Sequence, residues 1–338
     1  MTKGYSPKQE AHDFSYGKFT YDVISIGNAT QDVFVEISPK HAKKDVCFVP
    51  GHKIEIKGMH YHTGGGASNT SAAFSKMGLK AAIVSELGND PAGKAIEEEL
   101  KEYGIGRELL IRSKVKTAYS VILTGFGKDR VILAYSGATA CLKDKDIKWN
   151  KINAKWVHVS SLHKKPKLME KICVHAKKRG AMVSINPGKT ELSAGLKKLE
   201  KTFRNADVLF LNESEALSLT GSANIERNLG LLHNYCNKIV ITAGAKGAYV
   251  YDGKTVYFKD IFPVTVTDAT GCGDAFNSGF IAALIYGKTI EEALLWGSAQ
   301  SNSIVTKIGT KNILLNKRQI NKFLDSFKNG RKVRKRKM

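Results

Sequence analysis

Apolar positions along the chain fall into two kinds of segment that follow one another in turn. Short, nearly continuous apolar runs are typical of strands buried on both faces, and such runs lie within residues 21–28, 81–90, 156–160, 181–186, 207–211 and 238–248. Helices are expected at residues 70–77, 92–103, 167–178, 290–305 and 316–327, and a further helix is expected to begin at residue 212. Strands that alternate with helices in this way predict a mainly parallel sheet with helices on both faces.

Residues 33–62 and 117–134 follow a different pattern, in which apolar and polar positions alternate. This period is typical of antiparallel strands and does not suit the core of a parallel sheet. The two stretches therefore predict a small β lid that is separate from the α/β body. His60 and His62 would share one face of a lid strand, but a third metal ligand is not evident, so we interpret both as exposed lid residues.

A glycine-rich turn precedes a helix with the apolar spacing of a buried element. The turn reads Asp-Ala-Thr-Gly-Cys-Gly-Asp at residues 268–274, and Phe276 and Phe280 begin the apolar side of the helix. Free backbone N–H groups and the positive end of the helix dipole predict an anion site there. Asp274 could merely stabilise the dipole, or it could be a general base that deprotonates a hydroxyl while the N–H groups bind a phosphoryl group. The second carboxylate at Asp268 and the two glycines between them favour the general base.

The motif at 268–274 resembles the C-terminal signature of the ribokinase-like (PfkB) family of sugar and nucleoside kinases, whose usual form is Asp-Thr-x-Gly-Ala-Gly-Asp. Ala269 and Cys272 are mild departures from that form. The resemblance covers roughly residues 21–325, and it implies a ribokinase-like three-layer α/β/α sandwich with a mainly parallel central sheet and a small β-sheet lid. It also implies an ATP-dependent carbohydrate kinase that uses Mg²⁺ and, as in many relatives, a monovalent cation such as K⁺.

The same resemblance divides the chain into three parts. Residues 21–327 would form one kinase domain, with the lid at about 33–62 and 117–134. Residues 1–20 are polar and aromatic without a period, and we expect a poorly ordered leader. Residues 328–338 are a concentrated basic run that cannot bury apolar surface, so we expect a disordered tail with weak polyanion binding.

The acceptor side of the site is predicted at two turns. Asp32 lies just past the first strand, where ligands gather in parallel α/β sheets, although such an Asp can be a plain turn residue. The resemblance implies that Asp32 accepts hydrogen bonds from two sugar hydroxyls. It also implies that the N–H groups of Gly65 and Gly66 face the sugar and that Asn69 binds a vicinal diol. Some relatives carry an acidic sugar contact after a later strand, but residues 160–163 (Ser-Ser-Leu-His) do not supply one.

The nucleotide side is predicted at Asn212 and Glu215, which also fit a capping box at a helix start. The resemblance implies that this pair arranges Mg²⁺ and its waters near the nucleotide phosphates, and both roles are compatible because Mg²⁺ keeps most of its water shell. It further implies ATP contacts at Thr242, Gly244 and Gly247. The positions that match the carbonyls of a monovalent-cation site are Asp268, Thr270, Ile304, Lys307 and Gly309. The two Gly-Lys-Thr triplets lack the upstream glycine of a Walker loop, which excludes a P-loop enzyme.

The net charge of +22 comes from 53 Lys and Arg against 31 Asp and Glu. Lysines occur in nearly every segment, so we interpret most of this charge as solvated surface rather than as a nucleic-acid interface. The five cysteines show no metal or redox spacing, no signal peptide is evident, and the apolar runs are too short to span a bilayer. These features predict a cytoplasmic protein with reduced thiols and no membrane association.

We therefore expect ATP-dependent phosphorylation of a hydroxymethyl group of a sugar. Asp274 would be the general base, and the N–H groups of Gly271, Cys272 and Gly273 would form the anion hole. A nucleoside kinase or a sugar-phosphate kinase on the same fold stays open, because the residues do not decide the acceptor. A non-catalytic sensor is disfavoured by the intact motifs, and a nucleic-acid binder acting through the tail is the remaining class. The edges of the lid strands predict a homodimer through the lid.

Overall fold

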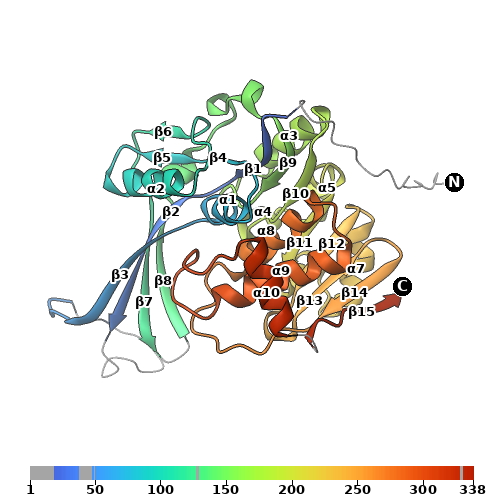
Figure 1. Ribbon diagram of the computed structural model, residues 1–338. Helices are drawn as coiled ribbons and strands as arrows, with labels where there is room; N and C mark the ends of the chain where they lie inside the picture. The colour runs from blue at the N-terminus through green and yellow to red at the C-terminus, as the bar shows by residue number, and fades with distance from the viewer. Residues whose placement is uncertain (1–18, 38–47, 49, 127–128, 328–329) are drawn as a thin grey trace.

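The computed structural model describes residues 19–37, 48, 50–126, 129–327 and 330–338 (Figure 1). Within them a nine-stranded sheet forms the centre of the molecule, in the order β15-β14-β13-β12-β11-β10-β9-β1-β4. The parallel strands are β4 (Ala81–Val84), β1 (Tyr21–Ile26), β9 (Ala154–Val159), β10 (Met182–Ile185), β11 (Val208–Asn212) and β12 (Lys238–Thr242). The antiparallel strands β13 (Ala248–Tyr251), β14 (Thr255–Lys259) and β15 (Arg334–Lys337) extend one edge.

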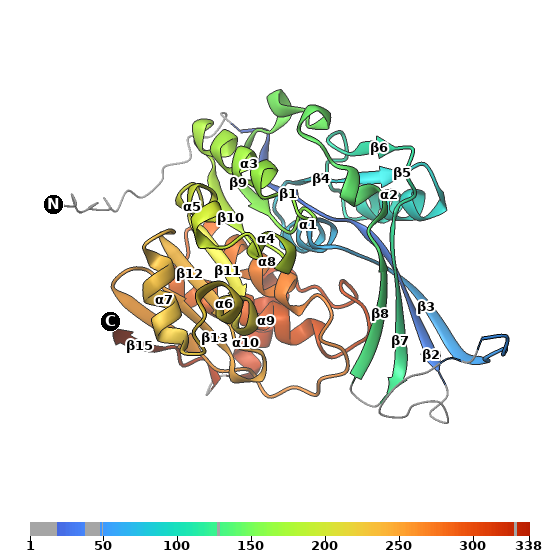
Figure 2. The same ribbon diagram turned by 180° about the vertical axis from the view of Figure 1, so that it is seen from behind.

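Helices cover both faces of this sheet (Figures 1 and 2). One face carries α1 (Gly66–Lys76), α2 (Pro91–Glu102), α8 (Cys272–Ile285), α9 (Ile290–Ile304) and α10 (Lys317–Ser326). The other carries α3 (Pro166–Lys178), α5 (Leu196–Arg204), α6 (Glu213–Thr220) and α7 (Ile225–His233), and the short α4 (Lys189–Leu192) follows β10. Side-chain alternation explains the two layers, since Val208 and Phe210 of β11 pack with the first group and Leu209 and Leu211 with the second. The predicted three-layer sandwich is confirmed.

A separate four-stranded sheet forms the predicted lid, which stands apart from the main sheet in Figure 1. Its order is β3-β2-β7-β8, from β2 (Thr30–Ile37), β3 (Ile56–Gly64), β7 (Ala118–Phe126) and β8 (Asp129–Tyr135). The pairs β2–β3 and β7–β8 are antiparallel, as expected, but β2 and β7 are parallel. The chain leaves the α/β body twice on the same side, once into β2 and once into β7. Both strands therefore run outward from the body, which makes them parallel. A short parallel pair, β5 (Glu86–Gly88) and β6 (Ile111–Ser113), completes the described strands.

The two faces of the lid differ in chemistry. Strand register places Asp32, His62 and Ser120 on one face, and hydrogen bonds and charge interactions join this inner face to the body. The opposite, outer face is apolar and open: Met59 is 47% exposed, Tyr61 59%, Leu133 55% and Tyr135 52%. His62 is half-buried and packs edge-on against Phe34, so the prediction that both lid histidines are exposed holds for His60 alone.

The start of α1 differs from the sequence-based prediction, which placed it at Thr70. The helix begins at Gly66, and Gly65 is its N-cap residue with φ of 91°. A positive φ strains any residue with a Cβ, so glycine is the residue that suits this cap. The glycine turn is thus joined directly to the first turn of the helix, and Asn69 lies one turn inside it.

The C-terminal run departs from the predicted disordered tail. Residues 334–337 form β15, which pairs antiparallel with β14 at the edge of the sheet. Lys335 forms an ion pair with Glu291, Arg336 with Glu226, and the Arg334 guanidinium lies 4.4 Å from the centroid of the Phe258 ring. The open edge of β14 supplies backbone partners that sequence composition does not reveal. Residues 1–18 of the predicted leader lie outside the described residues. None of the described helices is long and apolar enough to cross a bilayer.

Deletion of residues 334–338 should lower the free energy of unfolding by about 1–3 kcal/mol, because β14 loses its ladder partner. Urea denaturation followed by circular dichroism measures this change. The Glu226→Gln/Glu291→Gln double variant keeps β15 and removes only the acidic partners, so each lost surface pair should cost at most about 1 kcal/mol. An unchanged midpoint after the deletion would show that β15 contributes nothing to stability.

Candidate active site

The start of α8 is shaped as an anion site. Gly271 is the N-cap residue and adopts the left-handed conformation, with φ of 77° and ψ of 0°. A Cβ added there would lie 2.8 Å from Thr310 Cβ, so the position excludes larger residues on two grounds. The N–H of Cys272 makes only a long contact of 3.4 Å with Ala269 O, and the amides of the first helical turn have no partners within the helix. These amides and the helix dipole favour an anion.

Asp274 lies in the first turn of α8 and is partly exposed. Its Oδ2 accepts a hydrogen bond of 2.8 Å from Asn69 Nδ2 on α1. The pKa of Asp274 is raised above its ordinary value because burial disfavours the charged form, and the Asn69 hydrogen bond and the positive charge of Lys311 oppose part of that rise. A carboxylate with a raised pKa is a stronger base than an ordinary Asp, which suits proton abstraction from a hydroxyl.

The glycine turn before α1 meets the start of α8. A Cβ added at Gly66 would lie 3.6 Å from Asp274 Oδ1 and 2.7 Å from Ser160 Oγ. Gly65 and Gly66 are partly exposed, whereas Asn69 and Ser160 are buried. The structure therefore brings together the two glycine-rich turns that the sequence singled out about 200 residues apart. Ser160 fills the position beside them, in the region where the sequence lacks an acidic residue.

Asp32 reaches this region from the inner face of the lid. It is 6% exposed, and Thr30 Oγ1 donates a hydrogen bond of 3.0 Å to its Oδ1. Burial raises the pKa of Asp32, while hydrogen bonds from Ser120 and Thr30 and the charge of Lys311 counter part of the rise. Because Asp32 belongs to β2, the lid itself carries one of the predicted acceptor ligands.

The predicted nucleotide residues lie at the carboxyl ends of β11 and β12, where Asn212 and Thr242 are paired neighbours. Asn212 and Glu215 form the predicted capping box: Glu215 N donates to Asn212 Oδ1 at 2.8 Å, and Asn212 N donates to Glu215 Oε2 at 2.9 Å. The pKa of Glu215 is raised, mainly by burial and partly by the negative charge of Asp274, so the two carboxylates lie near each other. Gly244 and Gly247 flank the single turn that follows Thr242.

The two segments of the predicted monovalent-cation site run side by side. Asp268 N donates to Val305 O at 3.2 Å, and Gly309 N donates to Asp268 Oδ2 at 3.4 Å. Thr270 N and Oγ1 also donate to Asp268 Oδ1. Among the residues that the structure describes, no group of three or more His, Cys, Asp or Glu side chains is placed to hold a metal ion.

Several residues of the site carry no sequence signal that we recognised. Arg130 Nη1 on β8 lies 3.7 Å from Asp268 Oδ1, which links the lid to residues 268–273, called the anion loop below. Asn277 on α8 donates to Asn186 Oδ1 at 3.0 Å and so ties the helix to the end of β10. Thr310 and Lys311 lie behind Asn69 and are buried. Each of these contacts joins segments that are distant in sequence, so only tertiary structure reveals them.

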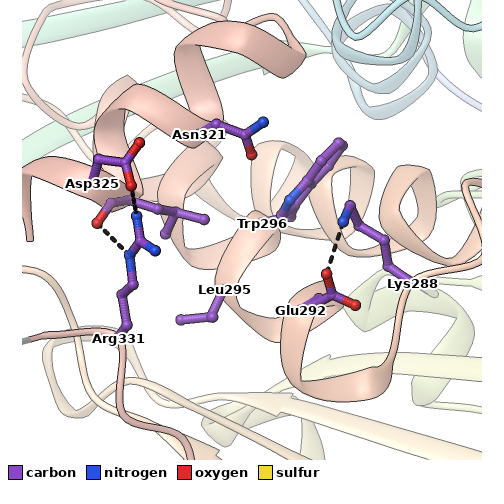
Figure 3. A pocket seen from close by; sticks show the side chains of 8 residues that line it. Lys288, Glu292, Leu295, Trp296, Asn321, Asp325 and Arg331 are labelled. Carbon is purple, nitrogen blue, oxygen red and sulfur yellow. Dashed lines mark hydrogen bonds and ion pairs between the residues drawn. The ribbon is translucent and has the colours of Figure 1, made fainter. Parts of the chain in front are cut away.

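A hollow of about 370 Å³ lies between α9, α10 and the C-terminal segment (Figure 3). Its charged side chains pair with one another, Lys288 with Glu292 at 2.8 Å and Arg331 with Asp325. None of the predicted site residues lines this hollow. It is therefore separate from the residues gathered around Asp274.

Comparisons with known proteins identify the family of this chain. The family model for pfkB family carbohydrate kinases matches residues 22–317. The chain is 25% identical over 292 residues to a nucleoside kinase of Methanothermobacter thermautotrophicus, across 86% of this chain and 91% of that protein. It is 26% identical over 291 residues to a ribokinase of Haemophilus influenzae, across 82% and 92% of the two chains.

The fold also resembles that of a solved ribokinase. The solved structure of Arabidopsis thaliana ribokinase complexed with ribose and ATP has a TM-score of 0.78 and 23% identity, and it covers 90% of this chain and 98% of that chain. The molecule is thus a kinase with the ribokinase fold. This chain belongs to the PfkB carbohydrate kinase family, as the motif at 268–274 predicted.

Gly271→Ala should reduce kcat at least about tenfold, because the added methyl group displaces the anion loop against Thr310. Gly287→Ala is the matched control: its φ of 71° imposes a similar backbone strain, but nothing lies within 4 Å of an added Cβ. Gly287→Ala should lose about 1–2 kcal/mol of stability in thermal or urea unfolding from the backbone strain alone, and Gly271→Ala should lose more because of the contact with Thr310. Equal kcat values for the two variants would argue against a functional anion loop at Gly271.

Proposed function

We propose that the protein transfers the γ-phosphoryl group of ATP to a hydroxymethyl group of a sugar, in the cytoplasm. The observation that carries the proposal is the contact between Asp274, at the amide-rich start of α8, and Asn69, on the helix that follows the acceptor-side glycine turn. A carboxylate, an anion-binding helix start and a set of polar acceptor ligands are the groups that phosphoryl transfer to an alcohol requires.

In the proposed reaction the acceptor hydroxyl lies beside Asp274. The hydroxyl oxygen forms a bond to the γ-phosphorus, the bond to the ADP oxygen breaks, and the hydroxyl proton passes to the Asp274 carboxylate. The N–H groups of Gly271, Cys272 and Gly273 stabilise the negative charge on the phosphoryl oxygens. The acceptor is positioned by Asp32, Gly65, Gly66 and Asn69.

ATP would bind along Thr242, Gly244 and Gly247, with its phosphates directed toward α8. Asn212 and Glu215 would arrange a Mg²⁺ ion through water: Glu215 Oε1 is not used in the capping box and can accept from a metal-bound water, whereas Asn212 Oδ1 accepts from Glu215 N and Ser214 Oγ and so fixes the turn beside it. When bound, Mg²⁺ neutralises charge on the β- and γ-phosphates. The carbonyls of Asp268, Thr270, Ile304, Lys307 and Gly309 are the proposed ligands of K⁺ behind the anion loop.

A nucleoside is the second candidate acceptor. The inner face of the lid carries an aromatic pair, Phe34 and His62, whose ring centroids lie 5.5 Å apart. Aromatic rings on the lid side favour a base over a small sugar alone. The two relatives named above, a nucleoside kinase and a ribokinase, span both acceptor classes. A sugar phosphate is the third acceptor to be tested on the same fold.

Asp274→Asn should lower kcat by about 10² or more and leave ATP affinity nearly unchanged, because the amide keeps the shape but cannot accept the proton. The assay is ATP consumption over ribose, fructose, adenosine, cytidine and fructose 6-phosphate. Since the base must be ionised and its pKa is raised, activity should fall with decreasing pH at a higher pH than an ordinary Asp would give. An unchanged kcat in the variant removes Asp274 from the mechanism, and a wild type inactive on the whole panel rejects the proposed acceptors.

We also propose that the outer face of the lid binds a second copy of the chain. The exposed Met59, Tyr61, Leu133 and Tyr135 form an apolar face, and a two-fold axis would let the same face of a second copy cover it.

Polyanion binding by the C-terminal strand should be weak, because Lys335 and Arg336 already face acidic partners.

The Tyr61→Lys/Leu133→Lys variant should sediment as a monomer at micromolar concentration, where the wild type sediments as a dimer. Repulsion and desolvation of the new lysines in the interface are the physical reasons. Leu217→Lys is the matched control, since Leu217 is a similarly exposed leucine (43%) on α6, outside the lid. A monomeric wild type, or a dimer in the double variant, rejects the lid interface.

A further inference from the structure

Lys311 is a buried lysine between α9 and α10, and its ammonium group meets three other elements. The side chain is 4% exposed, and Nζ lies 2.7 Å from Glu99 Oε2 on α2. Nζ also donates to Ser68 Oγ on α1 at 2.9 Å and to Thr63 Oγ1 at the end of β3. A lysine ammonium has three donors, and all three are used here. The charge is therefore fixed in place, directly behind the acceptor side, where Ser68 precedes Asn69.

The residue before Lys311 connects this cluster to the proposed base. The hydroxyl of Thr310 lies 2.8 Å from Asn69 Oδ1 and 3.1 Å from Thr63 O. Donation to Oδ1 orients the Asn69 amide, so that its Nδ2 points to Asp274. The segment that holds the lysine thus also sets the hydrogen bond that Asp274 receives.

The charges around Lys311 are unbalanced. Burial lowers the pKa of Lys311, and the nearby carboxylates of Glu99, Asp32 and Asp274 raise it in part. In return, its positive charge lowers the pKa of Asp32 and of Asp274 against the rise that burial causes. Charges in a protein interior are unfavourable unless opposite charges lie close. Lys311 thus interacts with all three carboxylates, and it forms its direct ion pair with Glu99.

The other titratable groups beside these carboxylates cannot take over this role. The charge of Asp274 raises the pKa of Glu215 on α6 and of Cys272 in its own helix. Neither of these two groups carries a positive charge. Asp32 faces His62 of β3, whose pKa is lowered by burial, so its imidazole is mainly neutral near pH 7. Among these groups, Lys311 is the one that lowers the pKa of both Asp32 and Asp274.

We propose that Lys311 is a positioning residue of the phosphotransfer site. Clamped by Glu99, Ser68 and Thr63, it holds a positive charge behind Asp32 and Asp274 and keeps both carboxylates ionised and in place. The lysine touches neither the acceptor nor the nucleotide in this role. The inference builds on the proposed function, but the charge interaction itself is measurable without any substrate.

The test is a titration of Asp274 in the full chain, with aspartate labelled with ¹³C at Cγ and observed by NMR. The Asp274 signal is assigned by its loss in Asp274→Asn. In Lys311→Met the titration midpoint should rise by about half to one pH unit, because a nearby cation stabilises a carboxylate and its loss does the reverse. In Glu99→Gln, which removes the carboxylate that holds the ammonium in place and raises its pKa, the midpoint should also rise, but by less than in Lys311→Met.

Lys259→Met is the matched control, because Lys259 at the end of β14 is also fully buried and pairs with Asp260, but it is not among the groups that shift the pKa of Asp274. It should lose stability without moving the Asp274 midpoint. If Lys311→Met does not fold, Glu99→Gln alone decides the question. An Asp274 midpoint that stays fixed in the folded variants overturns the proposal.

Kinetics on the same variants separate this inference from the proposed function. The acid limb of kcat should move upward with the NMR midpoint, in Lys311→Met and to a smaller extent in Glu99→Gln. A shift in the NMR midpoint without a shift in the acid limb supports the role of Lys311 on the carboxylate. It would at the same time remove Asp274 as the general base.

Discussion

The structure depends on one constraint at the start of α8: a carboxylate must share a small volume with amides that bind negative charge. Asp274 is attached to the same helical turn as those amides, so neither can move without the other. Desolvation raises the pKa of the carboxyl group, and the hydrogen bond from Asn69 limits that rise. The result is a carboxylate more basic than an ordinary Asp, beside amides that favour an anion.

The parallel sheet explains how two remote turns meet at this point. Helices α1 and α8 lie on the same face of the sheet and pack against each other, and each begins with a glycine N-cap of positive φ. Both N-termini therefore open toward the same edge, where β1, β9 and β10 end. Asn69 of α1 donates a hydrogen bond to Asp274 of α8. Asn277 of α8 donates one to Asn186, just past the end of β10. Small residues at the contact let the two turns approach closely.

The lid completes the arrangement from the other side. Asp32 and Arg130 both lie on its inner face, and they bring one negative and one positive group to the body. Asp32 lies against Gly64, beside the glycine turn that precedes α1, and Arg130 lies near Asp268, so a movement of the lid would alter the surroundings of both glycine-rich turns together. Because charge interactions are stronger away from water, closure of such a lid over bound substrates would strengthen the charge interactions of Asp32 and Arg130.

The sequence alone determined the layered α/β architecture, the separate lid and the two glycine-rich turns, because these depend on local periodicity and on residues with unusual backbone freedom. The family followed from the motif at 268–274 for the same reason. Tertiary structure decided the rest: the pairing of β15 with β14, the parallel contact of β2 with β7, and the cluster behind Asn69. These features join groups that are remote in sequence. The order of residues along the chain therefore does not show which buried charge or open strand edge will lie nearby.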